Sequence, residues 1–183
     1  MSLSPEQLVE LYDKQCLHDN LMTYCRAVDR MDLELMKTTY WEDSTDDHGS
    51  FVGGGQAWAD AALGWKDAIY SVNHHVSNVL SEVEGNRAKR ESMFICVTAF
   101  KEPRVYMFQA GRYRDLCEKR NGAWKILNRV CVWDWCEERE VKNGWHLALM
   151  PEQSNWGAFF PSDPIYKDWE RAAPTTIPKH LAA

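Results

Sequence analysis

The chain has 183 residues, of which 45% are hydrophobic and 26% charged, a composition typical of a globular domain and not of a disordered segment. Its net charge is -6 and its sequence pI about 5.5, and it has no basic stripe, which argues against a nucleic-acid partner. No window approaches the roughly 18 apolar residues of a membrane span, and the N-terminus lacks the pattern of a secretory signal.

The six cysteines are scattered through apolar runs, without a Cys-x-x-Cys pair or a Cys/His cluster of zinc-finger spacing. Free thiols in the core are therefore expected, and they fit a reducing compartment. We expect a cytoplasmic protein with no metal site and no membrane partner.

The first predicted element is a helix that starts after Ser4, with Pro5 in its first turn and Gln7 placed to complete a capping box. Apolar residues then recur at helical spacing as far as Val28, although the polar run 18–20 could break the helix. Asp29 stands at its end, an acid embedded in an apolar helix.

A short second helix is predicted to begin with Asp32 as its N-cap and to end before Tyr40. Residues 44–55 are rich in turn formers, and only Phe51-Val52 reads as a short strand within them. Apolar spacing predicts a third helix over residues 56–71.

From residue 76 the apolar period changes to two, which indicates strands joined by hairpins. The predicted strands cover residues 76–83, 87–102, 105–119 and 123–135. Helices followed by an antiparallel meander predict an α+β fold, with the helices on one face of a curved sheet and a pocket between them. Residues 1–136 would form this domain, and residues 137–183 an aromatic, proline-punctuated extension that lids the pocket or contacts another subunit.

His74 and His75 lie side by side where the helical pattern gives way to the strand pattern. Our central hypothesis is that Asp29 orients His74, which moves a proton on a small apolar substrate. The alternative is that both are structural polar residues. Strand alternation puts the two imidazoles on opposite faces, which leaves His75 as a structural residue.

Several local motifs resemble the SnoaL-like branch of the NTF2-like superfamily over about residues 6–135. They are Tyr24-x-x-x-x-Asp29, His74-x-x-x-Asn78, the Gly85 turn followed by Ala88, Gly111-x-Tyr113, and Gly122-x-Trp124-Lys125-Ile126-x-x-Arg129. The resemblance implies a cone made of a curved antiparallel sheet of about five to six strands wrapped on three helices.

Within that branch the chain looks most like the cofactor-free lyases, which include hexachlorocyclohexane dehydrochlorinase, scytalone dehydratase and bile-acid 7α-dehydratase. The resemblance implies that Asp29 is the acid of a catalytic dyad, that His74 is the base, and that no cofactor is needed. It also implies that Tyr24 and Arg129 stabilise developing negative charge. His48 could be a second acid at the same mouth, or a turn residue that caps its acidic neighbours.

The cavity walls are expected to come from aromatic and apolar side chains, which predicts an apolar, aromatic or polycyclic substrate. These residues are Trp41, Phe51, Trp58, Phe108, Cys131 and Trp133. The extension is longer than in the resembling lyases, and the substrate cannot be read from the sequence.

The leading hypothesis is a cofactor-independent lyase, with dehydration first and retro-aldol deformylation of a phenolic compound close behind. Dehydrochlorination or isomerisation of a related ketone would use the same residues. The alternatives are a non-catalytic β subunit of an aromatic-ring-hydroxylating dioxygenase and a ligand-binding module. The aromatic extension favours a homo-oligomer, and the resemblance favours a trimer over a dimer.

Overall fold

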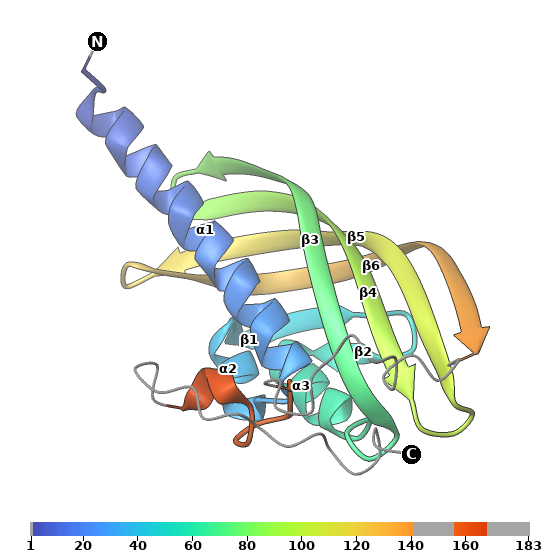
Figure 1. The fold of residues 1–183 in the computed structure, drawn as a ribbon. Helices are drawn as coiled ribbons and strands as arrows, with labels where there is room; N and C mark the ends of the chain where they lie inside the picture. The colour runs from blue at the N-terminus through green and yellow to red at the C-terminus, as the bar shows by residue number, and fades with distance from the viewer. Residues whose placement is uncertain (1, 141–155, 168–183) are drawn as a thin grey trace.

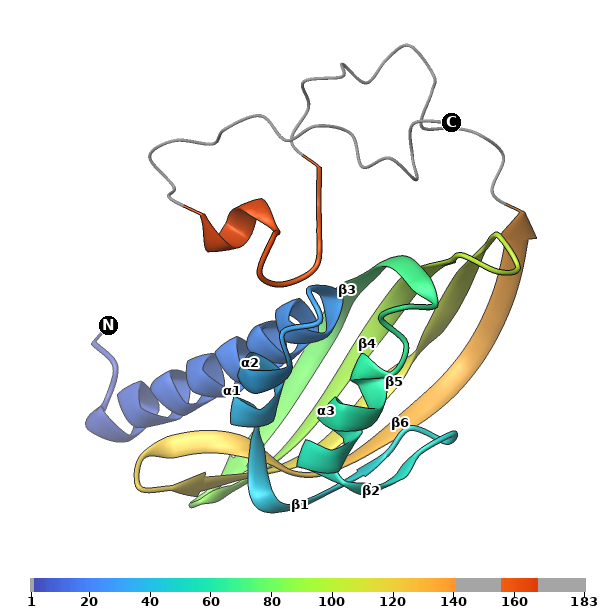
Figure 2. The ribbon, with the colours of Figure 1, turned by 90° about the horizontal axis from the view of Figure 1, so that it is seen from below.

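The computed structural model describes residues 2–140 and 156–167. Within them, three helices lie against the concave face of one curved six-stranded sheet (Figures 1 and 2). The helices are α1 (Pro5–Asp29), α2 (Leu33–Thr38) and α3 (Gly55–Leu63). This arrangement confirms the α+β cone, and the sheet remains open because its two edge strands do not pair.

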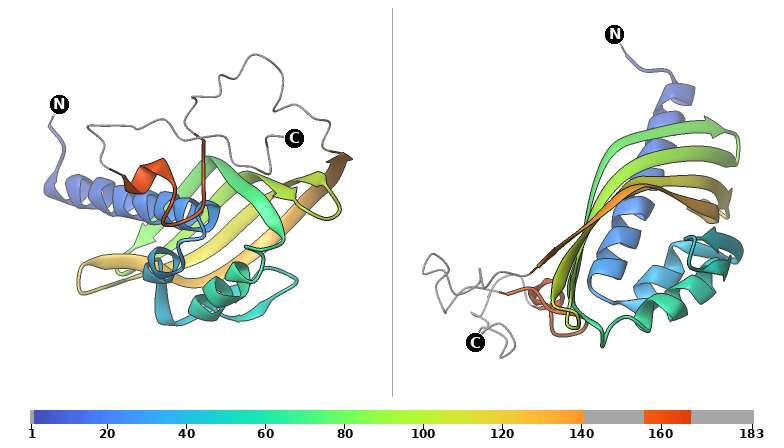
Figure 3. Two further views of the ribbon diagram at one scale, coloured as in Figure 1. Left: turned by 60° about the horizontal axis from the view of Figure 1, so that its bottom comes forward. Right: turned by 90° about the vertical axis from the view of Figure 1, so that its right-hand side faces the viewer.

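The strand order in the sheet is β2-β1-β6-β5-β4-β3. All neighbours are antiparallel except β1 and β6, which run parallel. The long strands β3 to β6 curl around α1 (Figure 3). The strand bounds are β1 Tyr40–Asp47, β2 Val52–Gly54, β3 Ile69–Glu84, β4 Arg87–Phe100, β5 Val105–Arg120 and β6 Ala123–Glu140.

Helix α1 is continuous from Pro5 to Asp29, and the break considered for residues 18–20 does not occur. Its start has the predicted capping box, in which Ser4 accepts from the Gln7 N–H at 3.3 Å and donates its own N–H to Gln7 Oε1 at 2.9 Å. Leu17 and Leu21 are fully buried against the sheet, which holds the helix through the polar run. No helix among the described residues is long and apolar enough to cross a membrane.

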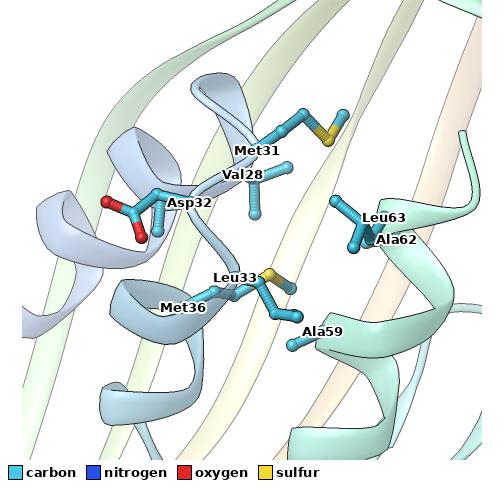
Figure 4. Close-up of a pocket in the computed structure, with 9 residues that line it drawn as sticks. Val28, Met31, Asp32, Leu33, Met36, Ala59, Ala62 and Leu63 are labelled. Carbon is cyan, nitrogen blue, oxygen red and sulfur yellow. The ribbon is translucent and has the colours of Figure 1, made fainter. Parts of the chain in front are cut away.

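The three helices meet around a small apolar gap of about 10 Å³. Figure 4 shows its walls, with Met31 and Leu33 facing Ala62 and Leu63 while the Asp32 carboxylate points away. That carboxylate instead accepts from the Leu35 N–H at 3.2 Å and caps α2 as predicted. The gap has space for at most one water, so the substrate site must lie elsewhere.

Helix α3 is shorter than predicted, because it ends at Leu63 with Gly64 as its C-cap. The chain turns through residues 65–68 and enters β3 at Ile69, well before the predicted strand start at residue 76. Sheet pairing overrides the helical apolar pattern here, since Ile69 pairs with Phe100 and is buried. The earlier start also places His74 within the strand.

Strand β1 was not predicted, and the prediction of a turn-rich segment from residue 44 was wrong for its first part. Its sequence is polar and acidic, which sequence reasoning assigns to a loop. Its inward side chains Ser44 and Asp46 are nevertheless buried, and parallel pairing with β6 holds the strand in place. Asp46 is thereby placed in contact with His48, which lines the cavity described below.

The described part of the C-terminal extension, residues 156–167, packs against the C-terminal end of α1 (Figure 1). The Phe160 N–H donates to the Arg30 carbonyl at 2.6 Å, and the buried Asp163 lies 3.3 Å from Arg30 Nε. The sheet itself reaches past the expected boundary at residue 136, since β6 ends at Glu140. Trp145 and Trp169, which the sequence places in the extension, lie outside the described residues.

Candidate active site

A cavity of about 320 Å³ opens between the inner face of the sheet and the helices. Two rungs of inward side chains form one wall, since Val72, Thr98 and Met107 stand in register across β3, β4 and β5. The next rung consists of His74, Cys96 and Gln109. No Asp, Glu, Lys or Arg of the described residues lines this cavity. Its interior is therefore suited to a neutral guest.

Asp29 and His74 meet at the edge of this cavity. His74 Nδ1 lies 2.6 Å from Asp29 Oδ1, and the His74 backbone N–H donates to the same carboxylate at 3.0 and 3.1 Å. Because β3 is an edge strand, its N–H is free to take a side-chain partner from the end of α1. A carboxylate only accepts, so Nδ1 carries a proton, and Nε2 is the nitrogen that gains or loses the second proton.

The protonation of His74 is set by burial and by two neighbours. Burial alone would lower the pKa of this imidazole, but the Cys96 side chain and the Asp29 carboxylate outweigh it and raise the pKa well above its usual value. Both Asp29 and His74 are largely buried. The pair thus has the geometry of an oriented proton-transfer group.

His48 also lines this cavity, and it directly follows β1, near the edge of the sheet opposite to β3. Its Nδ1 contacts Asp46 Oδ1, and its Nε2 lies 3.3 Å from the Tyr24 hydroxyl. The ring stacks on Trp58 at a centroid distance of 4.0 Å. His48 therefore lies at the cavity, as a second acid would, and also contacts Asp46, as a residue that caps its acidic neighbours would.

Tyr24 lines the cavity, and its hydroxyl accepts from the Trp58 indole N–H at 3.1 Å. Burial raises the pKa of this phenol, and the Arg129 guanidinium opposes only part of that effect. Tyr24 is therefore protonated at neutral pH.

Arg129 is fully buried but does not line the cavity. Its Nε and Nη2 donate to the Asp115 carboxylate at 2.7 and 2.8 Å, and Arg90 binds the same carboxylate at 2.6 and 3.0 Å. The guanidinium lies 4.1 and 4.0 Å from the ring centroids of Tyr24 and Tyr113. The structure thus brings Arg129 behind the cavity wall, where it can act on a substrate only through these rings.

Two of the expected wall residues, Trp58 and Trp133, line the cavity, and the other four do not. Trp41 donates to the Glu118 carbonyl at 2.9 Å, beside Arg120 and Lys125, and Phe51 lies behind Trp58 at 5.5 Å. Phe108 occupies the opposite parity of β5 from the lining residues Met107 and Gln109, and Cys131 is packed into the core.

Sequence reasoning missed several lining residues, although the signal was present. Val72, Cys96, Thr98 and Phe100 alternate with outward positions on β3 and β4, on the same face as His74. Counting by twos from His74 across the predicted hairpins would have found them. Val72 was missed because the predicted third helix extended too far, through residue 71.

Among the described residues, no cluster of three or more His, Cys, Asp or Glu side chains has the geometry of a metal site.

Solved structures with the same architecture share little sequence with the chain. A putative scytalone dehydratase from Novosphingobium aromaticivorans has a TM-score of 0.66 at 20% identity, covering 73% of this chain and 91% of that one. Hexachlorocyclohexane dehydrochlorinase LinA-type3 from Novosphingobium barchaimii has a TM-score of 0.67 at 17% identity, covering 72% and 93%. The β subunit of a putative aromatic-ring-hydroxylating dioxygenase from Novosphingobium aromaticivorans has a TM-score of 0.57 at 17% identity, covering 69% and 92%. At these identities the likeness shows the fold alone.

Among curated protein sequences none matches the chain. The family model described as a SnoaL-like domain matches residues 9–130, which include most of α1, the Asp29–His74 pair and the first part of β6. The match covers well over half of the chain, so the protein belongs to the SnoaL-like family.

Proposed function

We propose that the protein is a cofactor-independent lyase that acts on a small neutral aromatic compound. The observation that carries the proposal is the 2.6 Å contact between His74 Nδ1 and Asp29 Oδ1, which orients a cavity histidine so that Nε2 is the nitrogen that exchanges the proton. The SnoaL-like fold is shared with lyases and with a dioxygenase β subunit, so the fold alone does not choose between them. A buried acid–imidazole pair at a cavity favours the enzyme.

Two reactions fit this site. In a dehydration, His74 takes a proton from carbon, the C–H electron pair forms the double bond, and the hydroxyl group leaves as water after receiving a proton. In a retro-aldol cleavage, the base takes a hydroxyl proton, the O–H pair forms a carbonyl, and the broken C–C bond leaves a carbanion that is then protonated. Asp29 stabilises the imidazolium in both cases.

The composition of the cavity supports the neutral, aromatic character of the substrate. The described lining residues include no Asp, Glu, Lys or Arg, so a carboxylate or phosphate group would be desolvated with only the histidines as possible counter-ions. Trp58, Trp65, Phe100 and Trp133 supply flat apolar surface.

The proposal is tested by incubating the purified protein with a panel of neutral aryl alcohols and phenols, followed by mass spectrometry. Loss of water identifies a dehydratase, release of an aldehyde a C–C lyase, and a product of unchanged mass an isomerase. Asp29→Asn is expected to abolish whichever reaction is found. No turnover across the panel, together with co-purification of a dioxygenase α subunit, would support the non-catalytic alternative.

A further inference from the structure

A second acid–imidazole pair, Asp46 and His48, faces the same cavity as His74 and has no part in the proposed reaction so far. His48 follows β1 and His74 stands on β3, on opposite sides of β6, β5 and β4 in the sheet. Both imidazoles line the cavity. A substrate between them would therefore meet a proton-transfer group on either side.

The proton positions in the hydrogen-bonded series Tyr24–His48–Asp46 follow from its donors and acceptors. The Asp46 carboxylate accepts from the Tyr40 hydroxyl at 2.6 Å and from His48 Nδ1, so Nδ1 carries the proton. His48 Nε2 then has a lone pair, and the hydrogen in its 3.3 Å contact with Tyr24 belongs to the Tyr24 hydroxyl.

The oxygen of Tyr24, which lines the cavity, consequently keeps one acceptor site. Its hydrogen is directed at His48, and one of its lone pairs takes the Trp58 indole N–H at 3.1 Å. The remaining lone pair can receive a hydrogen bond from a guest. Hydroxyl groups can supply that hydrogen, whereas ethers and ketones cannot.

We propose that the Tyr24–His48–Asp46 relay binds a second hydroxyl group of the substrate, different from the one that leaves or that His74 deprotonates, as a hydrogen-bond donor and accepts its proton. The inference deepens the proposed lyase function and rests on it for the identity of the reaction. It narrows the substrate to neutral aromatic alcohols or phenols. Asp46 and His48 act through Tyr24 and are positioning residues.

The proton transfer conserves charge within the site. The substrate O–H proton moves to the Tyr24 oxygen while the Tyr24 proton moves to His48 Nε2, and the O–H electron pair stays on the substrate oxygen. The imidazolium that forms lies against the Asp46 carboxylate, as in a hydrolase triad. Burial lowers the pKa of His48, with Asp46 opposing part of the effect, so the imidazole is neutral and able to accept.

A matched pair of probes tests the inference without any turnover. 2-Naphthol carries a hydroxyl donor, and 2-methoxynaphthalene has nearly the same shape but no donor. Fluorescence titration of the wild-type chain is expected to give about three- to tenfold tighter binding of 2-naphthol, the range that one neutral hydrogen bond supplies.

Asp46→Asn is the informative variant, since an amide can donate to His48 Nδ1 and thereby move the ring proton to Nε2. Nε2 would then donate to Tyr24, whose own hydrogen would turn to the cavity, and the preference for 2-naphthol should fall toward onefold. His48→Phe keeps the ring stack on Trp58 and should have the same effect. Asp47→Asn is the matched control, because the Asp47 carboxylate accepts from the Gly49 N–H at 2.8 Å and, among the described residues, from neither His48 nor Tyr40.

Equal binding of the two probes by the wild-type chain would overturn the inference, as would a preference that survives in both Asp46→Asn and His48→Phe. Circular dichroism of each variant distinguishes loss of the Tyr24–His48–Asp46 hydrogen bonds from unfolding of the protein. The conservative Asp46→Asn variant remains informative if His48→Phe unfolds. The two proposals fail differently. Unaltered turnover in Asp29→Asn would contradict the proposed lyase mechanism, whereas the preference for 2-naphthol over 2-methoxynaphthalene would be unaffected.

Discussion

Asp29 and His74 come together because the last residue of α1 lies beside an edge strand, where an unpaired N–H and an imidazole of the same residue bind one carboxylate. The pairing hypothesis came from the sequence because both residues interrupt otherwise apolar patterns. The structure brings them into hydrogen-bond contact, and their catalytic role remains a proposal. A contact of His48 with its acidic neighbours was one of the two expectations from the sequence, whereas its burial beside the cavity could not be predicted, since it depends on burying a polar strand.

The raised pKa of His74 predicts the pH profile of turnover. A base must be neutral, so kcat/KM should rise with pH through an acid limb that lies above about 6.5, the ordinary value for histidine. Asp29→Asn removes a carboxylate that stabilises the protonated form, so the acid limb of any residual activity should move to lower pH. A limb that stays in place in this variant, or a rate that falls as pH rises through it, would contradict the role of His74 as base.

Asp115 forms ion pairs with two buried guanidiniums, those of Arg90 and Arg129. Asp115→Asn would leave excess buried positive charge and is expected to lower the free energy of unfolding by about 3–5 kcal/mol, as measured by urea denaturation. Asp134→Asn is the control, because its pair with Arg112 at 3.4 Å is exposed and should contribute at most about 1 kcal/mol. Equal effects of the two substitutions would show that the buried cluster is not a determinant of stability.

At the scale of elements, local signals predicted well and sheet pairing did not. The starts of α1 and α2 were predicted because caps are encoded within a few residues, and β4 and β5 because hydrophobic alternation and turns agree. The polar strand β1 and the early start of β3 depend on partners distant in sequence, namely β6 and β4. Arg129 was placed at the substrate from the resemblance, whereas its position behind Tyr24 and Tyr113 depends on tertiary packing.

Gly111 marks a close approach between β5 and β6 at the bulge beside the cavity. A Cβ at this position would meet the Val132 carbonyl and the Phe94 ring. Gly111→Ala is therefore expected to cost about 1–3 kcal/mol of stability through overpacking, measured by thermal or urea unfolding. Gly54→Ala, whose Cβ would make only ordinary contacts at 3.8 Å or more, should cost less. The assignment of Gly111 as a packing requirement fails if its variant is as stable as Gly54→Ala.

For the whole molecule, we propose that the protein is a homo-oligomer with a trimer favoured over a dimer. Apolar side chains are exposed on the strands of the sheet, which on a monomer would face water. They include Leu80 at 69%, Met93 at 37%, Ile95 at 45% and Trp135 at 49% exposure. Sedimentation velocity should give a trimer mass, and Ile95→Lys should shift it toward the monomer. A monomeric wild-type chain at micromolar concentration would contradict the proposal.

The central claim, that His74 moves the proton, is tested most directly by comparing His74→Gln with His75→Gln on a substrate found in the panel. The two histidines are adjacent on β3, but His74 lines the cavity beside Asp29 whereas His75 is exposed. Single-turnover rates are expected to fall on the order of 10²–10⁴-fold in His74→Gln and to stay near wild type in His75→Gln. Near-full activity in a folded His74→Gln variant would contradict the account.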